Sequence, residues 1–345
     1  MTLKVGVVGA GGIAVESHLP VLRSLKNVQV VAICDSRMDI AKEAASKFGI
    51  KNVFGDLESM LSKEEPNVVD ICTPPFTHLS LSVETMNNGC HVLVEKPMAA
   101  SVQEADTMLL ASKKNNVRLC VVHQNLYNPA VTKAKELVKS GALGDILHIE
   151  LRTFESRESE LCTNKDHWCH KLPGGIFYEI IPHPVYLSQY FLEDVKPVHV
   201  LGRKLGRSEW MKNDELRVLL EGRNGLGNVL ASCNSYIHGD TIDILGSKMA
   251  LRADLWGRTV ITFKPHTRSA LSVGMSNLAL SSQFLKVLGT TASTFFKASR
   301  GKASAHYMFI SRFIQSLTEN TEPPTTAEQG REAVVLLESI CGQLK

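Results

Sequence analysis

The sequence lacks the marks of a secreted, membrane-spanning or nucleic-acid-binding protein. Its eight cysteines form no C-x-x-C pair, which argues against a disulfide framework. No stretch of about 18 uninterrupted apolar residues occurs, so no transmembrane helix is predicted. The 38 lysines and arginines nearly balance the 35 aspartates and glutamates, and a net charge of +3 favours neither nucleic acid nor an acidic membrane surface. Because no basic, apolar leader opens the chain, we expect a cytoplasmic protein.

What is present indicates a globular protein of two domains. The chain has 345 residues, of which 44% are hydrophobic and 21% charged. Short apolar runs alternate with helical patterns up to residue 122, which is typical of a parallel sheet covered on both faces. These strand-like runs are Val5–Val8, Val28–Ile33, Val53–Phe54, Val68–Ile71, His91–Val94 and Leu119–Val122. We therefore predict a Rossmann dinucleotide-binding domain at 1–122 and a second domain at 123–345.

A glycine-rich turn follows the first strand. Residues 9–14 read Gly-Ala-Gly-Gly-Ile-Ala, which fits G-x-G-x-x-A between a strand and a helix. Such glycines let the backbone turn tightly and approach a pyrophosphate at the helix N-terminus. Asp35 ends the second strand at the spacing of a ribose-binding acid, which favours NAD. Arg37 leaves NADP open, since it would suit a 2′-phosphate. The turn and strand end predict cofactor contacts by Gly9, Gly11, Gly12, Ile13, Asp35, Ser36 and Arg37.

Further motifs carry a specific resemblance. They are Thr73-Pro74-Pro75-Phe76-Thr77-His78, the run Gly89 to Pro97 (GCHVLVEKP), Asn125-x-x-x-Pro129 and Gly141-x-Leu143-Gly144. In this order they resemble the Gfo/Idh/MocA oxidoreductase family. The resemblance implies that Lys96 polarises the substrate oxygen, that Glu95 helps fix the nicotinamide end, and that the Pro97 peptide is often cis. It also implies cofactor contacts by Thr73, Pro74, Pro75, His78, Glu95 and Lys96.

The second domain begins with a different pattern. Strand-like runs at short intervals, from Ile146–Phe154 to Val260–Lys264, predict a large, mostly antiparallel open sheet, and so an α+β domain. A long helical segment at Phe177–Phe191 carries Glu179 and His183, four residues apart and so on one helix face. Helical patterns return at Met275–Leu288, His306–Leu317 and Ala327–Leu344, the last opened by a capping box at Thr325-x-x-Glu328.

The resemblance places substrate chemistry on that long helical segment. The family has an Asp and a His there, the His as proton acceptor, so His183 is the expected acid–base and Glu179 orients the substrate. Tyr186 stands where the family often has an Asp. An alternative is that His183 is a packed histidine bonded to the backbone. A family loop over the substrate predicts contacts by His167 and Trp168, and Asn125 and Tyr127 would line the same pocket or merely cap and pack.

A metal site is not predicted. Cys162, His167, Cys169 and His170 lie close in sequence, but no second ligand pair completes a zinc set.

The leading function is NAD(P)-dependent oxidation or reduction of a secondary alcohol on a sugar, cyclitol, other polyol or nucleotide sugar. Two alternatives remain: a redox-neutral enzyme with tightly held, recycled NAD, and a non-catalytic NAD(P)-binding regulator. We expect a homo-oligomer, a dimer or tetramer formed through the C-terminal sheet. The segment Ser269–Phe296 has Lys286 as its one charged residue. It would line an apolar pocket, cover a subunit interface or touch a lipid-linked substrate.

Overall fold

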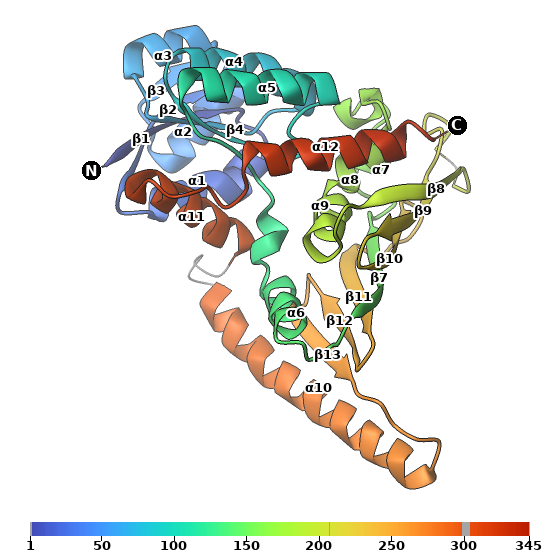
Figure 1. The fold of residues 1–345 in the computed structure, drawn as a ribbon. Helices are drawn as coiled ribbons and strands as arrows, with labels where there is room; N and C mark the ends of the chain where they lie inside the picture. Colours follow the sequence, from blue (N-terminus) through green and yellow to red (C-terminus); the bar gives the residue numbers. More distant parts are fainter. Residues whose placement is uncertain (1, 207, 299–303, 345) are drawn as a thin grey trace. The chain divides into compact units, whose positions relative to one another are not determined.

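A computed structural model describes residues 2–206, 208–298 and 304–344, with the side chains of 290–298 left out (Figure 1). The chain forms two compact units. Unit 1 comprises Met1–Gln124 and His306–Val335, and unit 2 comprises Asn125–Ala305 and Leu336–Lys345. The first boundary lies two residues beyond the predicted one. The prediction that 123–345 forms one domain differs from the structure, because residues 306–335 return to unit 1.

Unit 1 is built on a parallel six-stranded sheet with the order β3-β2-β1-β4-β5-β6, the order typical of Rossmann folds. The strands are β1 (Leu3–Val8), β2 (Val28–Cys34), β3 (Asn52–Phe54), β4 (Val68–Ile71), β5 (His91–Val94) and β6 (Leu119–Val121). The helices are η1 (Ala14–His18), α1 (Leu19–Ser24), α2 (Met38–Phe48), α3 (Leu57–Glu64), η2 (Pro75–Thr77), α4 (His78–Asn87), α5 (Val102–Asn115) and α11 (Ala305–Glu319). The predicted Rossmann fold is confirmed.

The strands are mostly apolar because helices cover the sheet. Figure 1 shows α3, α4 and α5 along one face, where Met60, Met86 and Met108 join the buried strand residues in one hydrophobic cluster. All these strands are parallel, so their carboxyl ends share one edge. The glycine turn after β1, the Thr-Pro-Pro loop after β4 and Glu95 after β5 therefore meet at that edge.

Residues 306–335 pack on unit 1 through buried apolar side chains. The local sequence pattern does not show which unit these side chains contact. Phe309, Ile310 and Phe313 of α11 are fully buried. In α12 (Ala327–Cys341), a Cβ atom added to Gly330 would lie 2.4 Å from Val121 Cγ2, so only glycine permits this close approach to β6. Reciprocal bonds between Thr326 and Gln329 begin α12, so the capping box lies one residue later than predicted.

Unit 2 is built on a seven-stranded sheet with the order β13-β12-β11-β7-β10-β9-β8. Every neighbouring pair is antiparallel except β7 and β10, as the predicted mostly antiparallel sheet requires. The strands are β7 (Ile146–Phe154), β8 (Lys196–Arg203), β9 (Glu215–Gly222), β10 (Gly225–Ser232), β11 (Gly239–Gly246), β12 (Ala250–Asp254) and β13 (Thr259–Phe263). The helices are η3 (Gln124–Tyr127), α6 (Pro129–Lys139), α7 (Glu160–Thr163), η4 (Trp168–Lys171), α8 (Ile176–Ile180), α9 (Pro182–Phe191) and α10 (Ala270–Ala298).

The predicted single helix over Phe177–Phe191 is wrong. It is divided at Ile181 into α8 and α9. Pro182 causes the division, because proline has no N–H to donate into the preceding turn and disfavours helical backbone in the residue before it. Glu179 and His183 therefore lie on two helices rather than on one helix face.

No helix among the described residues is both long and apolar enough to traverse a lipid bilayer.

Candidate active site

The glycine turn after β1 has the geometry of a dinucleotide cradle. Gly9 has a φ of +94°, and a Cβ there would lie 2.7 Å from the Cys72 carbonyl oxygen, so a side chain is excluded. At Gly11 and Gly12, in contrast, a Cβ would meet nothing within 4 Å. The turn thus leaves open space beside bare backbone, as a pyrophosphate requires.

Asp35 is fixed against this turn from the end of β2. Its Oδ2 accepts a hydrogen bond of 2.9 Å from the Ala10 N–H, and its Oδ1 accepts one of 2.9 Å from the Arg37 N–H. The Arg37 side chain is exposed, and its Nε lies 3.9 Å from Asp35 Oδ1. Ser36 is also exposed. The carboxylate therefore stands at the glycine turn as a ribose-binding acid would, which fits NAD.

A histidine that the sequence analysis did not select lies beneath the turn. The helix after the glycines contains a π-turn, in which the Leu19 N–H donates to the Ala14 carbonyl, and His18 is its last residue. The fully buried His18 ring donates from Nδ1 to Asp70 Oδ2 (2.8 Å) and from Nε2 to Glu95 Oε1 (2.8 Å). Burial opposes the charged ring, but the Asp70 carboxylate outweighs it and holds the His18 pKa well above the ordinary 6.5. His18 is therefore an imidazolium.

This imidazolium fixes Glu95 at the end of β5. Glu95 Oε1 is bonded to His18, while Oε2 accepts from the Lys96 N–H at 3.0 Å. Burial works to raise the Glu95 pKa, yet the bond and charge of His18 lower it to about 2. Glu95 is thus a buried carboxylate that positions the backbone from which the half-buried Lys96 extends. The Lys96–Pro97 peptide is cis, as the resemblance implied.

A second histidine of unit 1 lies against the same pair. The His306 ring centroid lies 5.8 Å from that of His18. Burial first, and then the positive charge of His18, lower the His306 pKa to about 4, so this ring is neutral. His306, like His18, was missed because a lone helical histidine gives no local signal.

His78 joins two of the predicted cofactor loops. Its ring is buried, with Nε2 2.8 Å from the Thr73 carbonyl oxygen and Nδ1 3.0 Å from the Pro97 carbonyl oxygen. Burial lowers its pKa. The ring therefore lies between the Thr-Pro-Pro loop, which includes the half-buried Pro74 and the buried Pro75, and the turn after Lys96. Ile13 in the glycine turn is exposed.

In unit 2, His183 lies in a short hydrogen-bonded chain. Its Nδ1 is 2.8 Å from the Tyr186 hydroxyl oxygen, and the two rings meet edge to face. The Asn125 N–H donates to the same hydroxyl at 3.2 Å. The Tyr186 hydroxyl therefore contacts both the His183 ring and the Asn125 backbone. The structure brings Asn125 and His183 to one place within unit 2.

The remaining predicted residues of unit 2 lie on or beside α8, η4 and η3. Glu179 lies on α8, and its charge contributes to the raised pKa of the buried Cys169 thiol, about 12, for which burial is the main cause. His167 and Trp168 are half-buried, and their ring centroids lie 5.1 Å apart at η4. Tyr127 is half-buried in η3.

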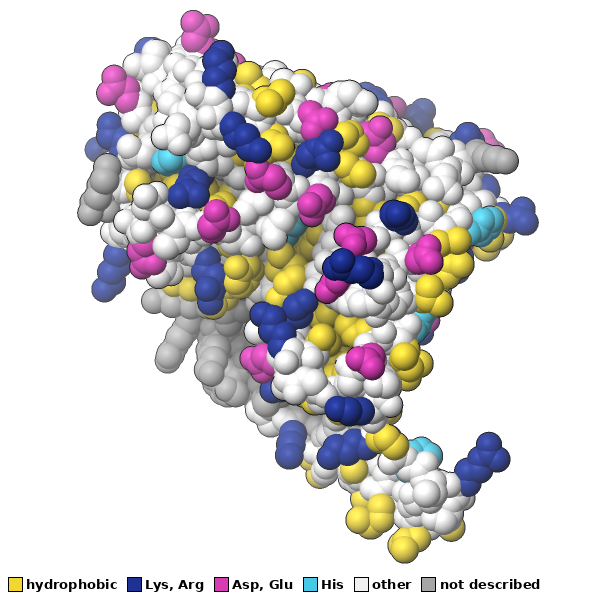
Figure 2. Space-filling view, viewed as in Figure 1, with side chains coloured by type: hydrophobic (Ala, Val, Ile, Leu, Met, Phe, Trp, Pro, Cys, Tyr) yellow, Lys and Arg dark blue, Asp and Glu magenta, His cyan; other side chains and the backbone are white. Residues whose placement is uncertain are grey.

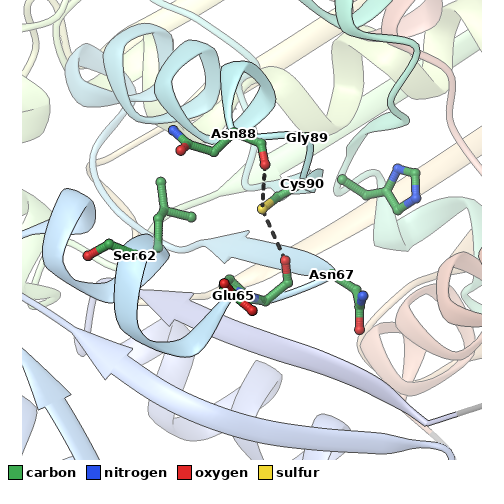
Figure 3. A pocket seen from close by; sticks show the side chains of 9 residues that line it. Ser62, Glu65, Asn67, Asn88, Gly89 and Cys90 are labelled. Carbon is green, nitrogen blue, oxygen red and sulfur yellow. Dashed lines mark hydrogen bonds between the residues drawn. The ribbon is translucent and has the colours of Figure 1, made fainter.

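A hollow of about 450 Å³ in unit 1 is not part of the cofactor site (Figure 3). It is lined by Asn67, which precedes β4, and by His91, which opens β5. It therefore lies at the amino ends of the strands, whereas ligands of such sheets bind beyond the carboxyl ends. In Figure 3 the Cys90 thiol bonds the Pro66 carbonyl (3.0 Å), and burial raises the thiol's pKa.

Family models match both parts of the chain. Residues 3–123 match the model described as "Oxidoreductase family, NAD-binding Rossmann fold", and residues 131–252 match that of the GFO/IDH/MocA C-terminal domain. The chain belongs to the Gfo/Idh/MocA oxidoreductase family. Its N-terminal unit is an NAD-binding Rossmann domain, and α10 lies outside both matched ranges.

Individual relatives agree with this assignment. Oxidoreductase P35 of Formosa agariphila is 28% identical over 197 residues, which are 56% of this chain and 61% of the relative. Myo-inositol 2-dehydrogenase of Thermotoga maritima is 26% identical over 260 residues, 73% of this chain and 75% of the relative. The crystal structure of the WlbA dehydrogenase from Bordetella pertussis with NADH and UDP-GlcNAcA has a TM-score of 0.79 at 22% identity. That match covers 99% of this chain and 95% of the other, and it shows the shared fold.

Proposed function

We propose that this member of the family uses NAD to interconvert a secondary alcohol and a ketone on a sugar, cyclitol, related polyol or nucleotide sugar. The observation that carries the proposal is the His18–Glu95 pair, which fixes the Lys96 backbone beside a complete glycine turn and Asp35. A dinucleotide-binding regulator has no need of this fixed lysine. The inositol dehydrogenase among the relatives supports a polyhydroxy substrate.

The proposal gives Lys96 and His183 different chemical roles. Lys96 of unit 1 would donate a hydrogen bond to the substrate oxygen and stabilise the charge that develops there. His183 of unit 2 would take or return the hydroxyl proton. This role requires Nδ1–H to donate to the Tyr186 oxygen, because Nε2 is then the basic nitrogen. Glu179 would accept from a further substrate hydroxyl. Bound NAD supplies the hydride chemistry.

The test is reduction of NAD and NADP by purified protein with cyclitols, free sugars and UDP-linked sugars. Reduction of NAD by at least one class, and weaker use of NADP, is the expected result, since Asp35 repels a 2′-phosphate. Lys96→Ala should lower turnover at least about a hundredfold while NAD affinity stays nearly unchanged. Nucleotide that remains bound through purification, with no net reduction by any substrate, would favour the redox-neutral alternative instead.

We further propose a homo-oligomer formed through the outer face of the unit 2 sheet. Leu219, Leu226 and Leu245 are exposed there, and the register places Leu226 and Leu245 on either side of His148. A row of exposed leucines across neighbouring strands is typical of a subunit interface. Leu226→Glu should shift the sedimentation coefficient towards that of a monomer, and an unchanged value would exclude this face.

A further inference from the structure

Helix α10 is anchored along one side. The Gln283 side chain mimics a neighbouring strand at β13, since its Oε1 accepts from the Thr262 N–H (2.8 Å) and its Nε2 donates to the Thr262 carbonyl (3.0 Å). Ser276, Leu280 and Val287 on the same side are half-buried. Yet none of the described side chains of α10, residues 270–289, is buried. The helix therefore rests on β13 with one face and presents the opposite face outward.

That outward face is apolar. Leu271, Leu278 and Leu285 recur every seven residues, which is two helical turns, and helical geometry sets them opposite Gln283. Leu278 is 66% exposed and Leu285 is 71% exposed. Among the described side chains of α10, the exposed large apolar ones are Leu271, Val273, Met275, Leu278, Phe284, Leu285 and Leu288. An apolar surface of this length indicates a binding partner.

The charge around this helix has one sign. No aspartate or glutamate occurs between Asp254 and Glu319. The same stretch contains Arg258, Lys264, Arg268, Lys286, Lys297, Arg300, Lys302 and Arg312. Figure 2 shows yellow and dark blue side chains over the projecting end of α10, with no magenta among them. The net charge of +3 for the whole chain conceals this segment, because acids elsewhere offset it.

A groove of about 900 Å³ runs along the helix and continues the basic surface. Its lining comes from α10, β13 and α6, with the apolar Phe263, Met275 and Leu280 on its walls. The ionisable side chains that line it are all basic or histidine: Lys133, Arg258, Lys264, His266 and Lys286. Lys133 is paired with Glu136, which lies outside the lining, at 3.0 Å. A groove of this kind suits an anionic headgroup joined to apolar chains.

We propose that the outward face of α10, together with the basic side chains beside it, binds the surface of a membrane that contains anionic phospholipid. The leucines of the outward face would enter the boundary between headgroups and acyl chains, while Lys264, Arg268 and Lys286 would meet the phosphates. The long lysine stems suit this arrangement, because they keep the ammonium in water while their methylenes cover apolar surface. A second copy of this chain fits less well, because two such surfaces would bring like charges together with no carboxylate between them.

The test is flotation of the purified full chain with vesicles on a density gradient. One set of vesicles contains phosphatidylcholine alone, and the other contains phosphatidylcholine with phosphatidylglycerol. The protein should float with the anionic vesicles at low salt, at least about tenfold more than with the neutral ones, and salt should weaken this binding.

Two variants separate the apolar and ionic contributions. Leu278→Glu combined with Leu285→Glu should reduce flotation at least about tenfold, and Lys264→Glu combined with Lys286→Glu should do so with anionic vesicles. Leu110→Glu is the matched control, because Leu110 is 67% exposed on α5 of unit 1 and belongs neither to α10 nor to the groove lining, and it should float like wild type. Circular dichroism checks that each variant is folded.

Several outcomes would overturn the proposal. They are absence of wild-type binding to anionic vesicles, equal binding to neutral and anionic vesicles, and a leucine double variant that floats like wild type. Free phosphatidylglycerol headgroup (glycerol phosphate) that competes fully would mean that the groove binds a soluble anion rather than a membrane. Loss of a dimer on sedimentation in the leucine double variant, without vesicle binding by the wild type, would assign the face to a second copy.

Discussion

Two histidines, His18 of unit 1 and His183 of unit 2, differ in the charge of their partners. His18 of unit 1 is fully buried and donates both ring N–H groups to carboxylates. His183 of unit 2 is half-buried, and its Nδ1 meets the neutral hydroxyl of Tyr186. A ring between two anions holds its proton tightly, whereas the Tyr186 hydroxyl brings no negative charge to the His183 ring. We therefore propose that His18 positions Glu95 and that His183 transfers the proton.

The largest expected effect is on stability, at His18. His18→Leu would leave the buried carboxylates of Asp70 and Glu95 without their cation, which should lower the free energy of unfolding by about 3–5 kcal/mol. Urea denaturation measures this change. His183→Leu should lower the free energy of unfolding much less, because the His183 ring is half-buried and its partner is neutral. Equal losses in the two variants would remove the distinction between the two histidines.

The second expected effect is a loss of turnover on substitution of His183. His183→Ala should lower turnover at least about a hundredfold while the NAD dissociation constant stays nearly unchanged, as expected for an acid–base group outside the glycine turn. Steady-state kinetics and fluorescence titration with NADH measure the two quantities. Turnover within threefold or so of wild type would exclude His183 from the mechanism and leave it as a packed histidine.

A third expectation concerns pH. Because the His18 pKa is raised above 6.5, its contribution to stability is complete below pH 6.5 and disappears as pH rises through the raised value. The Glu95 pKa falls from 4.5 to about 2, so its contribution is complete above pH 4.5 and disappears as pH falls towards 2. The difference in unfolding free energy between wild type and His18→Gln should therefore be largest between about pH 4.5 and 6.5. A flat difference across pH 4–9 or so would show that His18 is not charged.

The sequence was most informative where the signal is local. The strands and the glycine turn of unit 1 follow from apolar runs and turn residues, and the predicted strands Val68–Ile71 and His91–Val94 have the observed bounds. The role of His18 could not be predicted, because its partners Asp70 and Glu95 lie 52 and 77 residues away. The same holds for residues 306–335, whose apolar helix faces suit either unit until their packing is known.

Unit 2 shows a different limit. The spacing of Glu179 and His183 predicted a shared helix face, although Pro182 between them already argued for a break at Ile181. The family motif identified which residue types to expect, whereas Pro182 predicted where the helix ends. The sequence showed that Tyr186 replaces the Asp that the family often has at this position. Only the structure shows that the Tyr186 hydroxyl contacts His183.

The smallest expected effect tests that hydroxyl. Tyr186→Phe keeps the buried ring and removes the oxygen between His183 Nδ1 and the Asn125 N–H. A neutral hydrogen bond contributes about 0.5–1.5 kcal/mol, so turnover should fall about threefold to tenfold. The pH profile of turnover should also move, because the bond selects the tautomer that makes Nε2 basic. If the hydroxyl has only a structural role, Tyr186→Phe would change the free energy of unfolding and leave the pH profile of turnover unchanged. Tyr186 would then not be a positioning residue for His183.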